Sequence, residues 1–169
     1  MSENTVFRTE GQELVMERVF HAPRELVFQA FTQAEHLKHW WGPQGWELPY
    51  CTVDLQPGGV WHYCMKCVDP AQGDFYGMES WGKAVYETIE APEKLGYTDY
   101  FSDAEGTVNE ELPSAKNELT FVEENGNTRL ISVTRYTSAE ELAKVLEMGM
   151  EQGIKETWDR AETYLQTLK

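Results

Sequence analysis

The residue types best suited to metal chemistry occur together at His62, Cys64 and Cys67. Side chains on a strand alternate between two faces, so His62 and Cys64 share a face while Cys67 points the other way. Two ligands on one face do not complete a tetrahedral zinc site. His36 and His39 form a second pair on a predicted helix, but nothing in the sequence ties the two pairs together. We therefore expect buried thiols and surface histidines, with no metal and no cofactor.

A second candidate for chemistry is the segment 77–84, which nearly matches the phosphate-binding pattern G-x-x-x-x-G-K-[ST]. Ala84 replaces the hydroxyl that would hold magnesium, and the segment leads into a predicted strand, whereas a phosphate loop must open a helix. The serine-hydrolase pattern G-x-S-x-G does not occur. A catalytic carboxylate needs burial and a shifted pKa, and the sequence offers Asp54 and Glu87 as candidates without evidence of either condition.

The elements that must position these residues follow from hydrophobic spacing and turn residues. Residues 14–20 alternate like a strand, and Pro23 suits the first turn of a helix, where its missing N–H would be unpaired anyway. Apolar residues at helical spacing follow, and a second short helix fits 34–41, before Gly42 and Pro43. Residues 102–115 form an acidic loop. Alternation and turn signals predict the further strands 46–55, 60–67, 82–89, 94–101, 118–123 and 128–136.

The end of the chain carries a helical pattern. Ser138 and Glu141 match a capping box, and apolar residues then recur at helical spacing to the C-terminus. Gly149 and Gly153 lie one turn apart in this stripe, although each glycine costs a helix about 1 kcal/mol relative to alanine. Close packing against the sheet, space left for a ligand, or a kink would each account for the pair. The element order predicts an α+β fold in which this helix covers the apolar face of an antiparallel sheet.

Aromatic residues are the main compositional signal: 6 Trp, 8 Tyr and 7 Phe make up 12% of the chain. Buried aromatic side chains are more often core than binding site. A sheet covered by a helix with two glycines in its stripe can nevertheless pack imperfectly. Aromatic and methionine side chains around such a gap would form an apolar small-molecule pocket.

Length, charge and cysteine content narrow the function classes. The chain has 169 residues and a net charge of −15, which suits one domain and argues against nucleic acid and anionic membranes as partners, since both attract Lys and Arg. The chain has only 3 cysteines, an odd number, which favours a reducing compartment. It shows no signal peptide and no apolar run long enough to span a membrane, so we expect a cytoplasmic protein. Residues 1–12 are polar and expected to be a flexible N-terminal segment, followed by a single domain over 13–169.

Several motifs, in a fixed order along the chain, resemble one family. They are residues 17–28, Trp-Trp-Gly-Pro at 40–43, Asp-x-x-Pro-Gly-Gly at 54–59, and segments 91–95 and 127–130. Over residues 13–168 the chain resembles the AHSA-like family, named for activators of a heat-shock chaperone ATPase, within the START-related, Bet v-like SRPBCC superfamily. The resemblance implies a helix-grip fold: a curved antiparallel β-sheet of about six to seven strands wrapped around a long C-terminal α-helix, with two short helices after the first strand.

The resemblance also implies a cavity between sheet and helix that binds a small, mostly apolar or aromatic ligand. Strand parity and the helical stripe predict the residues that contact this ligand: Trp61, Tyr63, Met65, Trp81, Tyr97, Met150, Ile154 and Trp158. Some members of the superfamily are cyclases or hydrolases, and an enzyme of that type would need an acid or base in the cavity, such as His62, Tyr63 or Asp54. A third hypothesis is a partner of a heat-shock chaperone, or another protein-interaction domain, in the stress response.

Two details bear on these hypotheses. Family members often carry Gly-Trp in the last helix, whereas here Gly153 is followed by Ile154, which changes the cavity wall. In the eukaryotic activator this domain follows a separate chaperone-binding domain, for which the present chain has no room. We therefore expect a stand-alone ligand-binding domain in preference to a chaperone activator, and leave enzymatic activity open.

Overall fold

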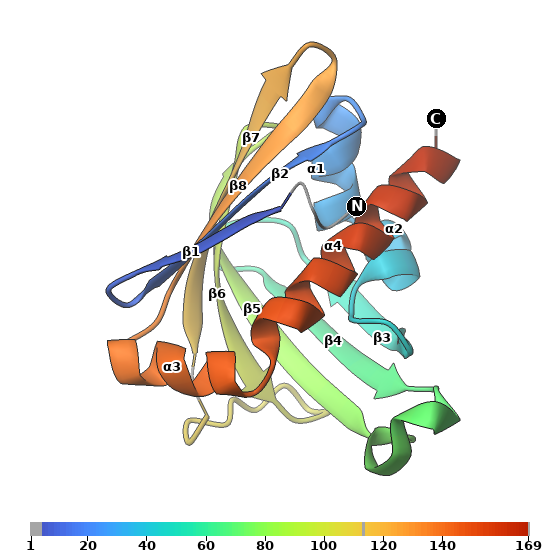
Figure 1. Cartoon of the computed structure of the whole chain (residues 1–169), viewed down its shortest axis with the longest axis vertical. Coiled ribbons are helices and arrows are strands. Elements are labelled where there is room, and N and C mark those ends of the chain that lie inside the picture. Colours follow the sequence, from blue (N-terminus) through green and yellow to red (C-terminus); the bar gives the residue numbers. More distant parts are fainter. Residues whose placement is uncertain (1–4, 113, 169) are drawn as a thin grey trace.

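One open antiparallel sheet of 8 strands forms the main layer, in the order β1-β2-β8-β7-β6-β5-β4-β3 (Figure 1). The computed structural model describes residues 5–112 and 114–168, so residues 1–4 of the expected flexible segment and residue 169 of the expected domain lie outside it. The strands are β1 Val6–Glu10, β2 Glu13–Phe20, β3 Trp46–Val53, β4 Val60–Cys67, β5 Glu79–Glu90, β6 Lys94–Ser102, β7 Ala115–Glu124 and β8 Asn127–Arg135.

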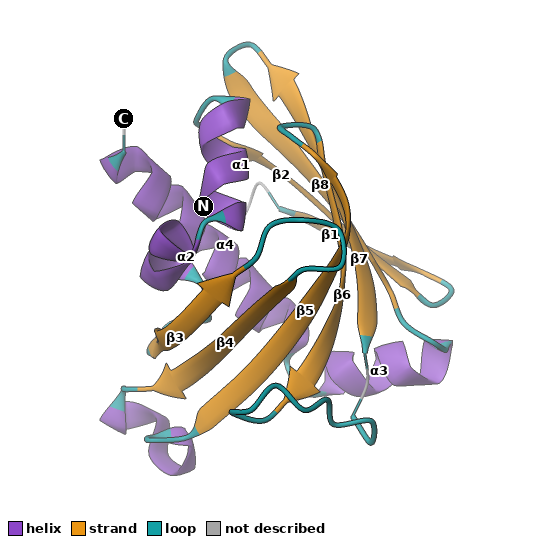
Figure 2. Cartoon of the chain, turned by 180° about the vertical axis from the view of Figure 1, so that it is seen from behind, coloured by secondary structure: helices purple, strands orange, loops and turns teal. Residues whose placement is uncertain are grey.

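The helices cover one face of this sheet. They are α1 Arg24–Thr32, α2 Ala34–Trp40, α3 Ala139–Glu147 and α4 Met150–Thr167. In Figure 1, α4 runs across the sheet, and in Figure 2, seen from behind, α4 passes behind the strands while α1 and α2 lie at its side. The predicted α+β class and helix-grip arrangement are confirmed: a curved antiparallel sheet grips a C-terminal helix, and two short helices follow the strand that opens the predicted domain.

Cross-strand register determines which side chains face the helices. Directly paired residues in neighbouring strands point to the same face. Trp61 pairs with Ala84, and Ala84 pairs with Asp99, so these three residues form one inward row across β4, β5 and β6. At the other side of the sheet, the ring of Phe20 on β2 lies 5.7 Å from that of Trp158 on α4. The concave face of the sheet is thus joined to the helix layer.

The close-packed core occupies only part of this concave face. Beneath α1, aromatic rings pack against β7, with Phe28 and Phe31 centred 5.2 and 5.8 Å from Phe121. The C-terminal half of α4 closes this region through Ala161 and Leu165, both fully buried. The N-terminal half of α4 lies over the remaining part of the sheet, and that part holds the candidate site.

The N-terminal segment differs from the expectation. Residues Val6–Glu10, expected to be flexible, form strand β1 and raise the strand count above the six to seven predicted. The strand is almost entirely exposed, so it lacks the alternation of apolar residues that reveals a half-buried strand. Backbone pairing with β2 through a turn at Gly11, whose φ is +62°, supplies the order.

The expected long C-terminal helix is broken. Ser138 does cap its start, because its hydroxyl accepts the backbone N–H of Glu141 at 3.1 Å, as the capping box predicted. The helix stops at α3, however, and α4 begins after Gly149, which has a left-handed φ of +86°. A continuous helix through Gly149 was therefore the wrong expectation, and the kink among the three alternatives is correct at this residue.

Most connections follow the sequence pattern. Residues 103–112 form a loop, within the acidic loop predicted over 102–115. The 3-10 helix η2, Pro70–Phe75, was not predicted, and the side chain of Asp69 caps it by accepting the N–H of Ala71 at 3.0 Å. Over residues 5–112 and 114–168, no helix is both long and apolar enough to cross a membrane.

Candidate functional site

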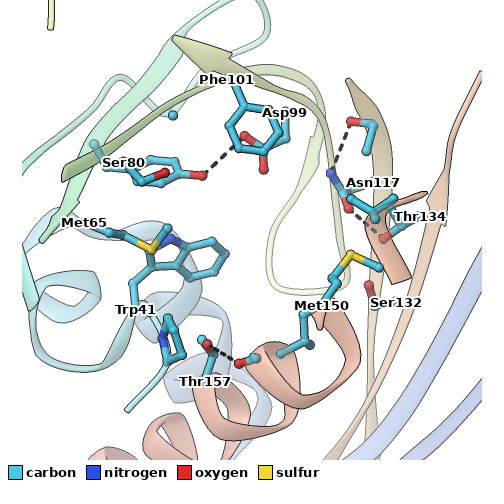
Figure 3. Close-up of a pocket in the computed structure, with 18 of the residues that line it drawn as sticks. Trp41, Met65, Ser80, Asp99, Phe101, Asn117, Ser132, Thr134, Met150 and Thr157 are labelled. Atoms are coloured by element: carbon cyan, nitrogen blue, oxygen red, sulfur yellow. Dashed lines mark hydrogen bonds between the residues drawn. The ribbon is translucent and has the colours of Figure 1, made fainter. Parts of the chain in front are cut away.

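A cavity of about 380 Å³ lies between the concave face of the sheet and the N-terminal half of α4. Its walls come mainly from β4 to β8 and α4, with the loop after α2 closing one side (Figure 3). This volume falls within the roughly 300–1,000 Å³ of pockets that hold small molecules. In this region the inward side chains of the sheet and those of α4 leave a gap between them.

Most of the residues expected to contact a ligand lie around this cavity. From the sheet, Tyr63, Met65 and Tyr97 face it, and Met65 is visible beside Trp41 in Figure 3. From α4, the lining residues include Met150, Ile154 and Trp158. The fold therefore brings these side chains, which lie far apart in the sequence, around one cavity.

The two predicted tryptophans of the sheet lie differently. Trp61 is buried outside the lining set, with its ring centred 4.6 Å from Trp41 and 4.7 Å from Tyr63. Trp81 borders the cavity, but its indole ring packs against His62 and Tyr50, with ring centres 5.1 and 5.4 Å apart. The register explains this outcome, because Tyr63 pairs with Gly82, which sends the neighbouring side chain of Trp81 to the convex face.

The cavity lining includes one carboxyl group, that of Asp99 on β6, which sequence reasoning missed. The hydroxyl of Tyr63 points to its Oδ1 at 3.4 Å (Figure 3). Burial raises the pKa of Asp99 to about 7, and hydrogen bonds from Tyr63 and the backbone N–H of Tyr100 only partly oppose this rise. One signal was available: Asp99 shares strand parity with Tyr97, which was expected to face inward.

Burial and the nearby Asp99 carboxyl both favour the neutral form of the neighbouring phenols. Burial, followed by the charge of Asp99, raises the pKa of Tyr63 well above its usual value. The same two causes raise the pKa of Tyr136 to about 12. The phenols therefore act as hydrogen-bond donors and acceptors in the cavity, and Asp99 is the group that changes charge near neutral pH.

A further group of polar side chains, separate from Asp99, lies on β7 and β8. The Thr134 hydroxyl donates to Asn117 Oδ1 at 2.8 Å, and Asn117 Nδ2 donates to the Ala115 carbonyl at 3.3 Å. Figure 3 shows Asn117, Thr134 and Ser132 on one wall, apart from Asp99. The hydroxyl of Tyr136 lies 3.1 Å from the sulfur of Met150. A ligand would thus meet a few polar atoms in a mainly apolar surface.

The glycines of the C-terminal region leave space. A Cβ at Gly153 would meet no atom within 4 Å, so close packing against the sheet does not explain this residue. Gly153 lines the cavity, and the Thr157 hydroxyl donates to its carbonyl at 2.8 Å. Gly149 lies at the break before α4, next to Met148, which is 71% exposed and marks the rim of the cavity.

The other chemical candidates from the sequence lie elsewhere. Asp54 is exposed and accepts from Gln56 Nε2 at 3.0 Å, and Glu87 is exposed beside Thr98. His62 was expected at the surface, but it is buried on the convex face, where its Nε2 lies 3.0 Å from the Asp103 carbonyl. Of the three residues proposed as an acid or base, only Tyr63 reaches the cavity.

The suspected metal and phosphate motifs do not form sites. His36 and His39 both contact Tyr164, the first through a 2.6 Å hydrogen bond and the second by stacking. Among the residues that the structure describes, no cluster of His, Cys, Asp or Glu could hold a metal ion. The three cysteines are buried free thiols, as expected. The segment 77–84 enters strand β5, as predicted, so its backbone forms no phosphate loop.

Comparisons with known proteins agree with this architecture. The family model described as Activator of Hsp90 ATPase homolog 1-like protein matches residues 21–166. Protein Ms6760 from Mycobacterium smegmatis is 28% identical with a TM-score of 0.79, over 97% of this chain and 96% of that one. A protein from Arthrobacter aurescens is 26% identical with a TM-score of 0.85, over 96% of this chain and 91% of that one. None of the curated proteins matches the chain.

Proposed function

Because this chain belongs to the family of Activator of Hsp90 ATPase homolog 1-like proteins, we propose that it binds a small, mostly apolar molecule between the sheet and α4. The observation that carries the proposal is the unfilled cavity of about 380 Å³ over the part of the sheet that the aromatic core does not occupy. Open pockets of this size that are lined mainly by apolar and aromatic side chains are the usual form of small-molecule binding sites.

The chemistry of the walls supports an apolar occupant. Trp41, Tyr97 and Phe101 present aromatic rings, and Met65 and Met150 add flexible thioethers that adapt to irregular shapes. Burial of apolar surface contributes about 25 cal/mol for each Å² removed from water. A ligand that fills this cavity would therefore gain most of its affinity from burying its own apolar surface. The scattered hydroxyl and amide groups would then orient the ligand.

Native mass spectrometry of the purified protein tests this proposal. We expect a small molecule bound at one equivalent, which denaturing extraction releases for identification. Gly153→Leu should abolish its retention, because the new side chain enters open space in the cavity. Gln152→Leu is the matched control, since Gln152 is exposed on the same helix.

The contrary result is an empty wild-type protein whose melting temperature no apolar compound shifts. Saturation at about 100 times Kd should stabilise the protein by roughly 2.7 kcal/mol, so binding would be visible in such a screen. That result would favour the chaperone interaction named in the family's description, measured as a change in the ATPase rate of the chaperone.

Catalysis in the same cavity is a second candidate, and Asp99 is the observation that favours it. A general base works best with a pKa near the working pH, and the pKa of Asp99 is raised to about 7. If the cavity turns over a substrate, Asp99→Asn should retain a molecule that differs in mass from the one retained by the wild type. Identical molecules in both proteins would support binding alone.

A further inference from the structure

The charges around the cavity restrict the ligand beyond its apolar character. In the part of the chain that the structure describes, no Lys, Arg or His lines the cavity. Its titratable lining groups are Asp99 and the tyrosines, and burial raises the pKa of Tyr63 and Tyr97 well above their usual values, so both stay neutral. The ionisable side chains on the lining are therefore all acidic, which disfavours a ligand with a carboxylate or phosphate in contact with them.

Asp99 has unused capacity to accept hydrogen bonds. An ionised carboxylate offers about four lone-pair positions on its two oxygens. The contact from the Tyr63 hydroxyl, at 3.4 Å, is longer than the 2.5–3.0 Å typical of O–H···O bonds. A buried carboxylate without a paired cation is costly, because the low-dielectric surroundings replace its water. A cation supplied by the ligand would remove this cost.

Aromatic rings surround the same end of the cavity. Figure 3 shows Phe101 next to Asp99, with Trp41 across the open space. Tyr97 lies on the same face of β6, two residues before Asp99, and also lines the cavity. The faces of aromatic rings attract cations, an effect that grows when water is excluded. A carboxylate among aromatic rings is thus suited to an alkylammonium group.

We infer that the cavity binds a mostly apolar molecule carrying one protonated amine, whose N–H group donates to the carboxylate of Asp99. This inference rests on the proposed function and names its ligand class. The apolar body of the ligand would lie along Met65, Met150 and Ile154, and the amine would occupy the end near Asp99. The raised pKa of Asp99, about 7, agrees with a carboxyl that lacks a cation in the empty cavity.

Three probes with the same body separate the charge from the apolar contribution. They are 4-phenylbutan-1-amine, 4-phenylbutan-1-ol and 5-phenylpentanoate, titrated calorimetrically into the full chain at pH 8. A hydrogen bond to a charged group contributes about 1.5–3 kcal/mol, so we expect the amine to bind about tenfold or more tightly than the alcohol. The carboxylate should bind most weakly.

The variant Asp99→Asn identifies the group responsible. It should remove the preference for the amine, so that the amine binds the variant no more tightly than the alcohol does. Asp54→Asn is the matched control, because Asp54 is an exposed carboxylate outside the cavity and its loss should leave the amine preference intact.

The outcomes distinguish this inference from the proposed function. If the alcohol binds but the amine binds no tighter, or if Asp99→Asn keeps the amine preference, the amine inference is overturned and apolar binding stands. If none of the three probes binds the wild type, both the amine inference and the binding of this apolar body are contradicted.

Discussion

Gly82 on β5 makes room for the ring of Tyr63 on β4. The two residues are directly paired, and a Cβ at Gly82 would lie 2.3 Å from Cζ and 2.4 Å from the hydroxyl oxygen of Tyr63. With no side chain at this position, the tyrosine ring extends over β5, and its hydroxyl reaches Asp99 on β6. One missing methyl group therefore determines how the polar end of the cavity is built.

Gly82→Ala should displace the Tyr63 ring and destabilise the protein. Overpacking of this kind costs typically about 1–3 kcal/mol. Urea unfolding measures the loss, and the same substitution in a Tyr63→Ala background is the control, because the clash is absent there. The two substitutions should be strongly non-additive. An equal cost of Gly82→Ala in both backgrounds would contradict the proposed contact.

Asp99→Asn should change how stability depends on pH. The pKa of Asp99 is raised from 3.8 to about 7 in the folded protein, so between these values the unfolded chain releases a proton that the folded protein keeps. The unfolding free energy contributed by Asp99 then falls as pH rises, by up to about 1.4 kcal/mol per pH unit, and levels off above pH 7.

Unfolding of the wild type and of Asp99→Asn at intervals from pH 5 to pH 8 isolates this contribution, because the other titrating groups are common to both. We expect the variant to gain stability relative to the wild type as pH rises. A constant difference between the two proteins across this range would show that Asp99 titrates normally.

Alanine substitutions at the two glycines of the C-terminal region should have opposite effects. Gly149 has a left-handed φ of +86°, a conformation that costs other residues about 1–2 kcal/mol, so Gly149→Ala should lower the melting temperature. Gly153 lies inside α4 with open space around its Cβ position, so Gly153→Ala should stabilise by up to about 1 kcal/mol. Changes of the same sign would argue against the break between α3 and α4.

Arg160 should anchor α4 beside the cavity. Its Nη1 donates to the carbonyls of Gly42, Pro43 and Trp46 at 2.7, 3.0 and 3.0 Å. Arg160→Met leaves these acceptors without the donor, and hydrogen bonds to charged groups contribute about 1.5–3 kcal/mol each. We expect a clear loss of stability in urea, whereas the exposed Arg8→Met should change little. An equal loss of stability in Arg160→Met and Arg8→Met would show that Arg160 does not anchor α4.

Much of the fold was predictable because apolar alternation marks strands that are buried on one face. Strand β4 has the predicted bounds, 60–67, since its inward tryptophan and tyrosine are bracketed by turn residues. Strand β1 gave no such signal, because it pairs through its backbone and only Phe7 among its five residues is partly buried. The apolar stripe ran through Gly149, where the sequence left a kink as one of three alternatives, since apolar spacing does not report a single left-handed residue.

The candidate site depended on register, which a single sequence specifies poorly. Tyr63 and Met65 alternate within one strand, and strand parity therefore expects both on the face where they line the cavity. Trp81 borders the cavity, but its ring packs against His62 and Tyr50, because its direction depends on the pairing of Tyr63 with Gly82. Asp99 was overlooked because a carboxylate in a strand usually marks the solvent face.

The space beside Gly153 should bind an apolar molecule. Calorimetric titration of 4-phenylbutan-1-ol into wild type, Gly153→Leu and the exposed control Gln152→Leu tests it most directly. We expect binding at one equivalent to wild type and to the control, with affinity at least about tenfold weaker in Gly153→Leu. Equal affinity for all three proteins, or no binding to wild type, would contradict it.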